Sequence, residues 1–259
     1  MPNGDFILTS EKGVALIEIS LGRGLNVFDS KAVKGLSALI GELGQTDVRC
    51  LVLTALGEKA FVAGADLKEM MPMGRMEAKN LCLAGNKLME KISAFPVPVI
   101  AAVNGYAIGG GLELALACDI RLASEKASFS LPEVSFGIIP GYGGIMRLSR
   151  LVGRGRASEL IFTARRLGAR EALDWGLINA VYPPTELLPE AMRMAQTIAS
   201  KPPLAVASAK KVLAQSEGLE ASKAYLLELG EFSNLFGTFD QLEAMRAFVE
   251  KRDPPPFKG

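Results

Sequence analysis

The sequence predicts an α/β fold with a helical region at its C-terminal end. Through the first 184 residues, short apolar runs typical of strands alternate with segments whose apolar residues recur at helical spacing. Such alternation is typical of a layered domain in which helices connect the strands. After about residue 184 the pattern is helical. We therefore expect an α/β core over residues 1–184 and a helical region over residues 185–259, which packs on the core or on a neighbouring subunit.

The first predicted elements are two strands with a helix between them. The apolar runs VALIEIS at 14–20 and CLVLTA at 50–55 have the length and composition of strands. Between them, Asp29 can cap a helix over about 30–43, because an aspartate side chain accepts hydrogen bonds from the free amides of a first helical turn. A long loop follows the second strand and leads to Asp66, which can cap another helix.

The remaining elements continue this pattern. A helix over about 75–93 ends before Pro96 and Pro98, because proline interrupts helical hydrogen bonding. The run VPVIAAV then predicts a strand, and three consecutive glycines lead into a short helix from about residue 110 to 117. The last predicted elements are a strand at DIRLAS, helices at 185–200, 203–215, 219–236 and 239–250, and an extended Pro-rich tail, RDPPPFKG.

Composition and charge exclude several classes of protein. The 29 basic and 28 acidic residues give a net charge of +1, which argues against a nucleic-acid-binding protein that works through bulk charge. No apolar stretch approaches the roughly 18 residues of a membrane span, and the N-terminus lacks the apolar segment of a secretion signal. The three cysteines are an odd number without C-x-x-C spacing, so we expect no disulfide framework or zinc site, and a reducing, cytoplasmic compartment.

The absence of histidine restricts the chemistry further. It excludes Ser-His-Asp and Cys-His catalysis and the usual imidazole metal sites. If the protein moves protons near neutral pH, carboxylates with a raised pKa are the leading candidates.

A first candidate carboxylate lies in NGYAIGGGLELALACD, residues 104–119. Glu113 falls in the first turn of the predicted helix among apolar neighbours, where an isolated charge is costly to bury. Its head could instead reach solvent and simply complement the helix N-terminus, and spacing alone leaves both interpretations open. The glycines before it allow a ligand to approach the free amides of the helix start, although the spacing fits no nucleotide-binding loop.

Two further loops have related features. In FVAGADLKEM the small residues 63–65 leave backbone amides open before Asp66, although an ordinary turn into a helix fits as well. Loops that follow neighbouring strands converge at the strand ends, where α/β proteins bind ligands. In SLPEVSFGIIPGYGG, Glu133 follows Pro132 within an apolar loop. A lone loop glutamate is usually at the surface, but one beside a second buried carboxylate would have a raised pKa.

Together these motifs resemble the enoyl-CoA hydratase/isomerase (crotonase) superfamily. The matching segments are AGADLKEM, PVIAAVNGYAIGGGLELALACD, LPEVSFGIIPGYGG, GLINAVYP and AFVEKRDPPPF, in the family's order and over nearly the whole chain. The resemblance implies a spiral of strand-strand-helix turns, a helical C-terminal trimerisation region, and assembly into trimers or dimers of trimers. It also implies an acyl-CoA thioester as substrate, with no metal or redox cofactor.

The resemblance assigns roles to particular residues. The backbone amides of Ala65 and Gly110 would form an oxyanion hole for the thioester oxygen. Glu113 would orient and deprotonate water for attack at Cβ, and Glu133 would supply the proton to Cα. The substrate- and CoA-binding positions implied by the motifs are Gly24, Leu25, Ala63, Ala65, Asp66, Leu67, Lys68, Gly109, Gly110, Pro132, Gly141 and Tyr142.

The implied activity is hydration of a trans-2-enoyl-CoA, as in the degradation of fatty, branched or aromatic acids. The alternatives are an enoyl-CoA isomerase or another thioester-enolate enzyme of the same superfamily, and a non-enzymatic scaffold or accessory RNA-binding member. The family's dienoyl-CoA isomerases carry an additional aspartate at the position of Gly141, and its haloaryl-CoA dehalogenases use an aspartate nucleophile in the same region. No aspartate lies between Asp119 and Asp174, which disfavours both.

Two segments depart from common hydratase patterns. PGYGGIMRL replaces the frequent PGAGGTQRL, so Tyr142, Ile145 and Met146 are expected to reshape the acyl pocket. LGRGLNVFD at 21–29 only loosely matches the stretch that helps to hold the CoA adenine, which weakens the assignment of Gly24, Leu25 and Lys68. Arg23 and Lys68 could meet the CoA phosphates, although a solvated surface charge fits each of them equally well.

Overall fold

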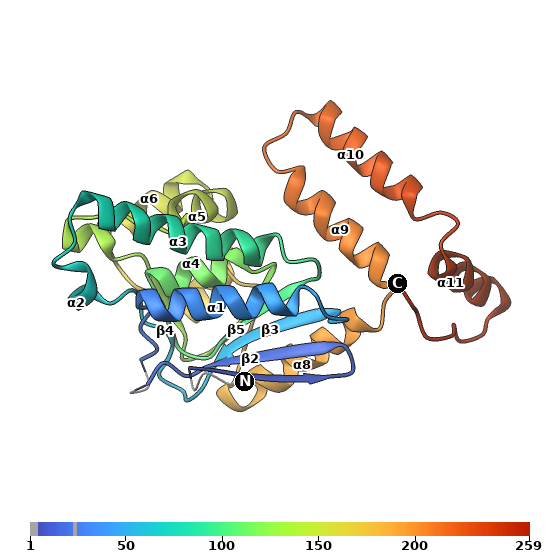
Figure 1. The fold of residues 1–259 in the computed structure, drawn as a ribbon, viewed down its shortest axis with the longest axis horizontal. Coiled ribbons are helices and arrows are strands. Elements are labelled where there is room, and N and C mark those ends of the chain that lie inside the picture. The colour runs from blue at the N-terminus through green and yellow to red at the C-terminus, as the bar shows by residue number, and fades with distance from the viewer. Residues whose placement is uncertain (1–4, 23–24) are drawn as a thin grey trace.

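The computed structural model describes residues 5–22 and 25–259 and contains two β-sheets with helices packed around them (Figure 1). The larger sheet has six strands in the order β1-β2-β3-β5-β7-β10, and the smaller has four in the order β4-β6-β8-β9. The strands of the larger sheet are Phe6–Glu11, Val14–Ile19, Cys50–Ala55, Val99–Val103, Ile120–Ser124 and Ala180–Tyr182. Those of the smaller are Ala60–Val62, Tyr106–Ile108, Ser128–Ser130 and Leu167–Gly168.

Consecutive strands alternate between the two sheets. In each of the pairs β3–β4, β5–β6 and β7–β8, the first strand lies in the larger sheet and the second in the smaller. Within each sheet the successive strands pair in parallel, while β1 with β2 and β8 with β9 pair antiparallel. The chain is therefore a spiral in which each turn adds a strand to both sheets before a helix returns it, as the resemblance to the crotonase superfamily implied.

The predicted helices begin and end close to the expected positions, and three further helices, which were not predicted, lie between residues 144 and 174. Asp29 accepts a hydrogen bond from the amide of Ala32 (2.7 Å), and Asp66 accepts one from Lys68 (2.8 Å), so both predicted caps are confirmed. The helices are α1 Ser30–Leu43, α2 Leu67–Met70, α3 Arg75–Ser93, α4 Gly110–Ala117, α5 Gly144–Val152, α6 Arg154–Thr163, α7 Ala169–Asp174, α8 Pro184–Ala199, α9 Pro203–Gln215, α10 Ala221–Asn234 and α11 Phe239–Glu250. A single 3-10 turn, η1, spans Glu133–Phe136. None of the described helices is long and apolar enough to cross a membrane.

The larger sheet is covered on both faces. Alternate residues of β2, β3 and β5 pack against α1, α3 and α4, while the residues between them pack against α8. This two-sided burial explains the continuous apolar run of β3, since strands of a covered parallel sheet have no solvent face. Helix α8, the first element after the predicted boundary at residue 184, therefore packs on the core, one of the two arrangements expected for the helical region.

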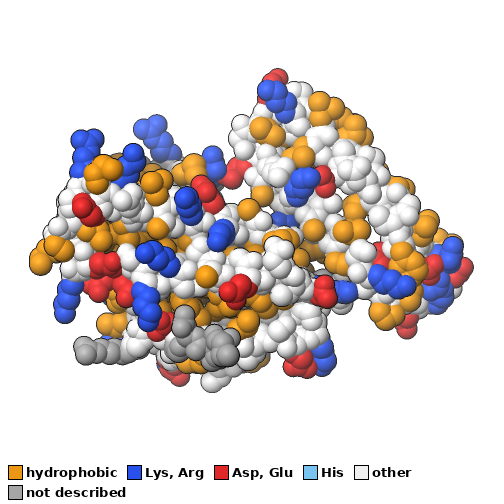
Figure 2. All heavy atoms as spheres, in the orientation of Figure 1, with side chains coloured by type: hydrophobic (Ala, Val, Ile, Leu, Met, Phe, Trp, Pro, Cys, Tyr) orange, Lys and Arg blue, Asp and Glu red, His pale blue; other side chains and the backbone are white. Residues whose placement is uncertain are grey.

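The helices that extend away from the core begin with α9 (Figure 1). An ion pair holds α9 to the sheet: Nζ of Lys210 donates to Oδ2 of Asp119 (2.8 Å) and to the carbonyl of Val97 (3.0 Å). The C-terminal tail returns to the core, where Arg49 donates to the carbonyl of Phe257 (2.7 Å). Figure 2 shows apolar side chains over this extension, and Phe248 of α11 is 85% exposed.

Candidate active site

A cavity of about 1030 Å³ opens among the loops that follow β4, β6 and β8. All three strands belong to the smaller sheet and run parallel, so their carboxyl ends bring the following loops together. The cavity is lined by Leu25, Ala63, Gly64, Ala65, Leu67, Met70, Ala78, Leu81, Cys82, Tyr106, Ile108, Gly109, Gly110, Glu113, Ser130, Pro132, Glu133, Ser135, Phe136, Gly137, Ile138, Ile139, Gly141, Tyr142, Ala164 and Arg166.

Glu113 is a buried carboxylate with specific hydrogen-bond donors. It lies in the first turn of α4 and is only 2% exposed, so the interpretation of a solvated helix-end charge is wrong. Its Oε1 accepts hydrogen bonds from the backbone amides of Tyr142 (2.7 Å) and Gly144 (2.8 Å). Burial raises the pKa of Glu113, while the two amides and the nearby Arg147 charge lower it. The hydrogen bonds occupy one oxygen and hold the carboxylate in a fixed orientation.

Glu133 has a different environment. It begins η1, and its Oε2 is buried without a hydrogen-bond partner among the described residues. Burial is the main cause that raises the pKa of Glu133 to about 7; its own backbone amide opposes this shift, and the neighbouring Glu113 charge contributes to it. A carboxyl group with this pKa can give or take a proton at neutral pH.

Two of the three consecutive glycines allow close contacts at the start of α4. A Cβ atom on Gly109, whose φ is +53°, would lie 2.7 Å from Oε1 of Glu133. A Cβ atom on Gly111 would lie 2.0 Å from the carbonyl oxygen of Val62, because α4 packs directly on β4. The glycines therefore bring a carboxylate and a neighbouring strand against the start of α4.

Two residues that line the same cavity, Ala65 and Gly110, have backbone amides that donate no hydrogen bond within the described part of the chain. The loop over residues 63–66 is held by Phe28, whose amide donates to Gly64 (2.8 Å) and whose carbonyl accepts from Asp66 (2.9 Å). The Ala65 amide lies between these bonds, and Gly110 is the first residue of α4. Among the described residues, neither amide donates a hydrogen bond. Free amides beside a carboxylate suit the stabilisation of negative charge on a carbonyl oxygen.

Most of the sequence-predicted positions line the cavity, but four do not. Asp66 caps α2, and Lys68 is exposed on that helix. Ile145 and Met146, which were expected to reshape the pocket, are 39% and 48% exposed on α5 and lie outside its lining. The buried residues of α5, Gly144, Leu148 and Val152, recur every four positions and form the face that packs on the core. Gly24 and Arg23 lie outside the described residues.

Several residues that line the cavity were not predicted from the sequence. Met70, Ala78, Leu81 and Cys82 come from α2 and α3, and nothing in their local pattern marks them. Tyr106 and Ile108 are detectable in principle, because alternate residues of β6 face one side. The residues Phe136, Ile138 and Ile139 did give a signal in the sequence, as large apolar side chains in the loop around Glu133, and the structure leaves them exposed.

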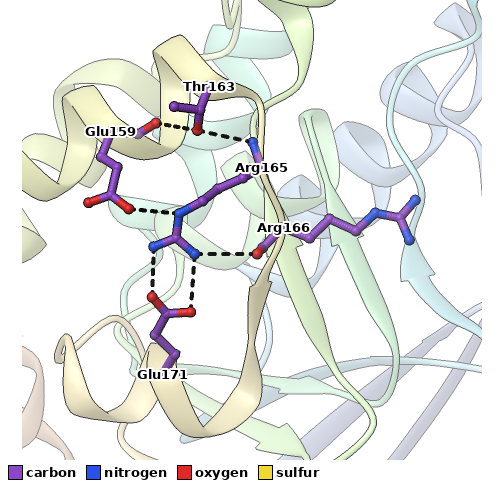
Figure 3. Close-up of polar contacts among 5 residues, drawn as sticks. All are labelled: Glu159, Thr163, Arg165, Arg166 and Glu171. Carbon is purple, nitrogen blue, oxygen red and sulfur yellow. Dashed lines mark hydrogen bonds and ion pairs between the residues drawn. The ribbon is translucent and has the colours of Figure 1, made fainter.

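Arg166 was also missed, and it follows an arginine that is held in ion pairs. Arg165 forms ion pairs with Glu159 (2.8 Å) and Glu171 (2.7 Å), and its amide donates to Oγ1 of Thr163 (3.3 Å). Figure 3 shows the side chain of Arg166 pointing away from this network. Its guanidinium lies 5.1 Å from the ring centroid of Tyr106, and Arg166 is the one cation among the described residues that line the cavity.

The sequence as a whole matches the profile of the enoyl-CoA hydratase/isomerase family over residues 9–259. The chain belongs to this family. It is 44% identical over 260 residues to the short-chain-enoyl-CoA hydratase of Clostridium acetobutylicum, covering 100% of both chains. It is 41% identical over 249 residues to the crotonyl-CoA hydratase of Syntrophomonas wolfei subsp. wolfei, covering 96% of each.

Solved structures of the enoyl-CoA hydratase/isomerase family have the same fold. The enoyl-CoA hydratase from Bacillus anthracis superimposes with a TM-score of 0.94 at 38% identity, covering 98% of this chain and 99% of that one. An enoyl-CoA hydratase from Geobacillus kaustophilus has a TM-score of 0.96 at 31% identity, covering 100% and 98%. The predicted crotonase-like α/β spiral is therefore confirmed.

Proposed function

We propose that this protein is an enoyl-CoA hydratase, a hydro-lyase that adds water across the 2,3-double bond of a trans-2-enoyl-CoA to give the 3-hydroxyacyl-CoA. The observation that carries the proposal is that two buried carboxyl groups with raised pKa values, Glu113 and Glu133, share one cavity with the free amides of Ala65 and Gly110. The relatives named as short-chain-enoyl-CoA and crotonyl-CoA hydratases support it.

The first step needs stabilisation of the thioester oxygen. As water attacks Cβ, the double-bond electrons move toward the carbonyl, and negative charge develops on its oxygen. The amides of Ala65 and Gly110 would donate hydrogen bonds to that oxygen, and losing one such donor typically costs roughly 10²–10³ in rate. The positive end of the α4 dipole acts in the same direction.

Glu113 and Glu133 each carry out one of the two proton transfers. Oε1 of Glu113 is occupied by the amides of Tyr142 and Gly144, so the other oxygen is available to orient and deprotonate water. The proton delivered to Cα would come from Glu133, whose pKa of about 7 allows the protonated form to exist at neutral pH. Neither step changes an oxidation state, and the proposed amides and glutamates supply the charge stabilisation and the proton transfers, so we propose that no metal or redox cofactor takes part.

We further propose assembly into a trimer or a dimer of trimers. The support is the exposed apolar surface of the C-terminal helices, where Tyr225, Leu226 and Phe232 of α10 and Phe248 and Val249 of α11 are each more than 60% exposed. Apolar surface of this extent on a soluble chain is typical of a subunit interface. Light scattering that shows a monomer at micromolar concentration contradicts this assembly.

A reducing, cytoplasmic compartment is also proposed. Its support is that Cys50 and Cys118 are buried free thiols.

The activity is tested by mixing the purified protein with crotonyl-CoA and following the absorbance of the conjugated enoyl thioester. We expect the absorbance to fall with formation of 3-hydroxybutanoyl-CoA, and EDTA to have no effect. A parallel assay with a 3-enoyl-CoA tests the alternative activity, because an isomerase raises this absorbance. Isomerisation without hydration across short, medium and branched substrates would overturn the proposal.

A further inference from the structure

Tyr142 fills a slot that exists only because residue 85 is a glycine. A Cβ atom on Gly85 would lie 2.0 Å from Cδ1 of the Tyr142 ring and 2.1 Å from Cε1. The other edge of the ring faces Gly110, where a Cβ atom would lie 3.4 Å from Cε2. Gly85 is buried in the interior of α3, a position where glycine is less stable than alanine, so its presence requires a reason such as this contact.

The ring cannot easily leave this slot. It is only 4% exposed and lies between the backbones of α3 and α4, which are both parts of the core. The loop that carries it is also fixed: the Tyr142 amide donates to Glu113, and the Gly141 carbonyl accepts from Sγ of Cys82 (2.8 Å) and Nδ2 of Asn86 (2.6 Å). Tyr142 is therefore a rigid part of the cavity wall.

The wall of the cavity on this side is apolar. The α2 and α3 residues that line the cavity are Met70, Ala78, Leu81 and Cys82. The wall formed by β6 and the loop before β9 instead carries Tyr106 and the cation Arg166. An acyl chain leaving the catalytic centre is apolar, so it is best accommodated toward α3 and Tyr142.

We propose that the Tyr142–Gly85 pair determines substrate chain length, with the Tyr142 ring closing the acyl end of the cavity against long chains. This proposal rests on the proposed acyl-CoA activity and specifies its substrate class as short-chain enoyl thioesters. The space that the ring occupies becomes part of the acyl site when the ring is removed. The same space can be filled from α3 instead, since the Cβ position of residue 85 lies within the ring.

The test compares wild type with Tyr142→Ala, Tyr142→Phe and the double variant Tyr142→Ala/Gly85→Phe. The measurement is kcat/KM for trans-2-decenoyl-CoA relative to crotonyl-CoA. We expect Tyr142→Ala to raise this ratio by roughly tenfold or more, because a single methylene in an apolar pocket changes specificity by about 10–200-fold. The double variant should return the ratio toward wild type, and Tyr142→Phe should leave the ratio unchanged because it keeps the ring.

A folded Tyr142→Ala protein with an unchanged ratio would overturn the proposal, as would a double variant that keeps the long-chain preference. If Tyr142→Ala does not fold, Tyr142→Leu should shift the ratio in the same direction by a smaller factor. Calorimetric binding of butanoyl-CoA and decanoyl-CoA gives a second readout that needs no turnover. A wild-type protein that binds these thioesters without hydrating enoyl-CoA refutes the proposed function alone, whereas unchanged relative affinities in Tyr142→Ala refute the length assignment.

Discussion

The carboxylate of Glu133 occupies the space in which a side chain on Gly109 would begin. The Oε1 atom lies 2.7 Å from the Cβ position of Gly109, whose φ of +53° and ψ of −121° are themselves accessible only to glycine. The amide of the next residue, Gly110, is the proposed donor to the thioester oxygen. One glycine therefore fixes the distance between the proposed proton donor and the proposed oxyanion hole.

Gly109→Ala should strongly reduce hydration. The added methyl group collides with the Glu133 carboxylate and forces it from its position, and a displaced acid or base typically costs roughly 10²–10⁴ in rate. The strained backbone should also lower the free energy of unfolding by roughly 1–3 kcal/mol. Steady-state kinetics with crotonyl-CoA and thermal unfolding measure the two effects separately.

Gly176→Ala is the matched control for this variant. Gly176 also has a positive φ, +75°, but a Cβ atom there has no neighbour within 4 Å, and the residue does not line the cavity. It should lose stability while keeping turnover. Equal losses of turnover in both variants would show that backbone strain, and not contact with Glu133, explains the result.

Substituting each glutamate by glutamine should separate their roles. Glu113→Gln removes the base that activates water, so hydration should fall by roughly 10²–10⁴, while slow exchange of the Cα proton continues through Glu133. Glu133→Gln should lose both activities, because the chain has no histidine to act as a substitute base. Hydration rates and deuterium exchange at Cα in D₂O test this. Normal exchange in Glu133→Gln with none in Glu113→Gln would reverse the two assignments.

The raised pKa of Glu133, about 7, predicts opposite pH profiles for the two reaction directions. Hydration needs protonated Glu133 to deliver a proton to Cα, so kcat/KM for crotonyl-CoA should fall as the pH rises through about 7. Dehydration of 3-hydroxybutanoyl-CoA needs the ionised form, so its rate should rise over the same range. The two carboxyl groups interact, so the measured midpoints describe the pair. Parallel profiles in both directions would exclude Glu133 as the titrating group.

The same pKa shift affects stability. An unfolded glutamate has a pKa of about 4.3, so between roughly pH 4.3 and 7 the folded protein retains a proton that the unfolded chain releases. Folding is then progressively less favourable as the pH rises through this window and constant above it. Glu133→Gln should therefore gain stability relative to wild type, on the order of 1–3 kcal/mol at pH 8. Urea unfolding at about pH 5 and pH 8 measures the difference.

Local chemistry explains which elements could be predicted from the sequence. Helix α1 and its cap at Asp29 depend on neighbouring residues, as does the fully buried strand β3. Strands β4, β6 and β8 have three residues each, too few to show an alternating pattern, and they form because distant segments pair. β1 was missed because only Phe6 in it is buried, so the strand lacks the alternation of a half-buried strand.

The features of the site that could be predicted from the sequence likewise lie within one segment, whereas those that could not depend on contacts between distant segments. Glu113 and the triglycine could be identified because a carboxylate next to glycines in an apolar helix is unusual within one segment. The Tyr142–Gly85 contact joins a loop to a helix that lies much earlier in the chain, and neither residue marks the other in the sequence. The partial departure of PGYGG from the family pattern indicated that Tyr142 matters, but only the fold shows that Gly85 accommodates it.

The Tyr142–Gly85 contact predicts that Gly85→Ala changes the free energy of unfolding in opposite directions with and without the Tyr142 ring. In wild type, Gly85→Ala places a methyl group within 2.0 Å of the Tyr142 ring, so it should destabilise the protein by roughly 1–3 kcal/mol through overpacking. In the Tyr142→Ala background the space is vacant, and the same mutation should stabilise by roughly 0.5–1 kcal/mol, because alanine is favoured over glycine in a helix interior. The two effects give a coupling energy well above the roughly 0.3–0.5 kcal/mol seen between independent sites. Chemical unfolding of the four proteins measures it, and a Gly85→Ala effect of the same sign in both backgrounds would show that α3 shifts to accommodate the ring.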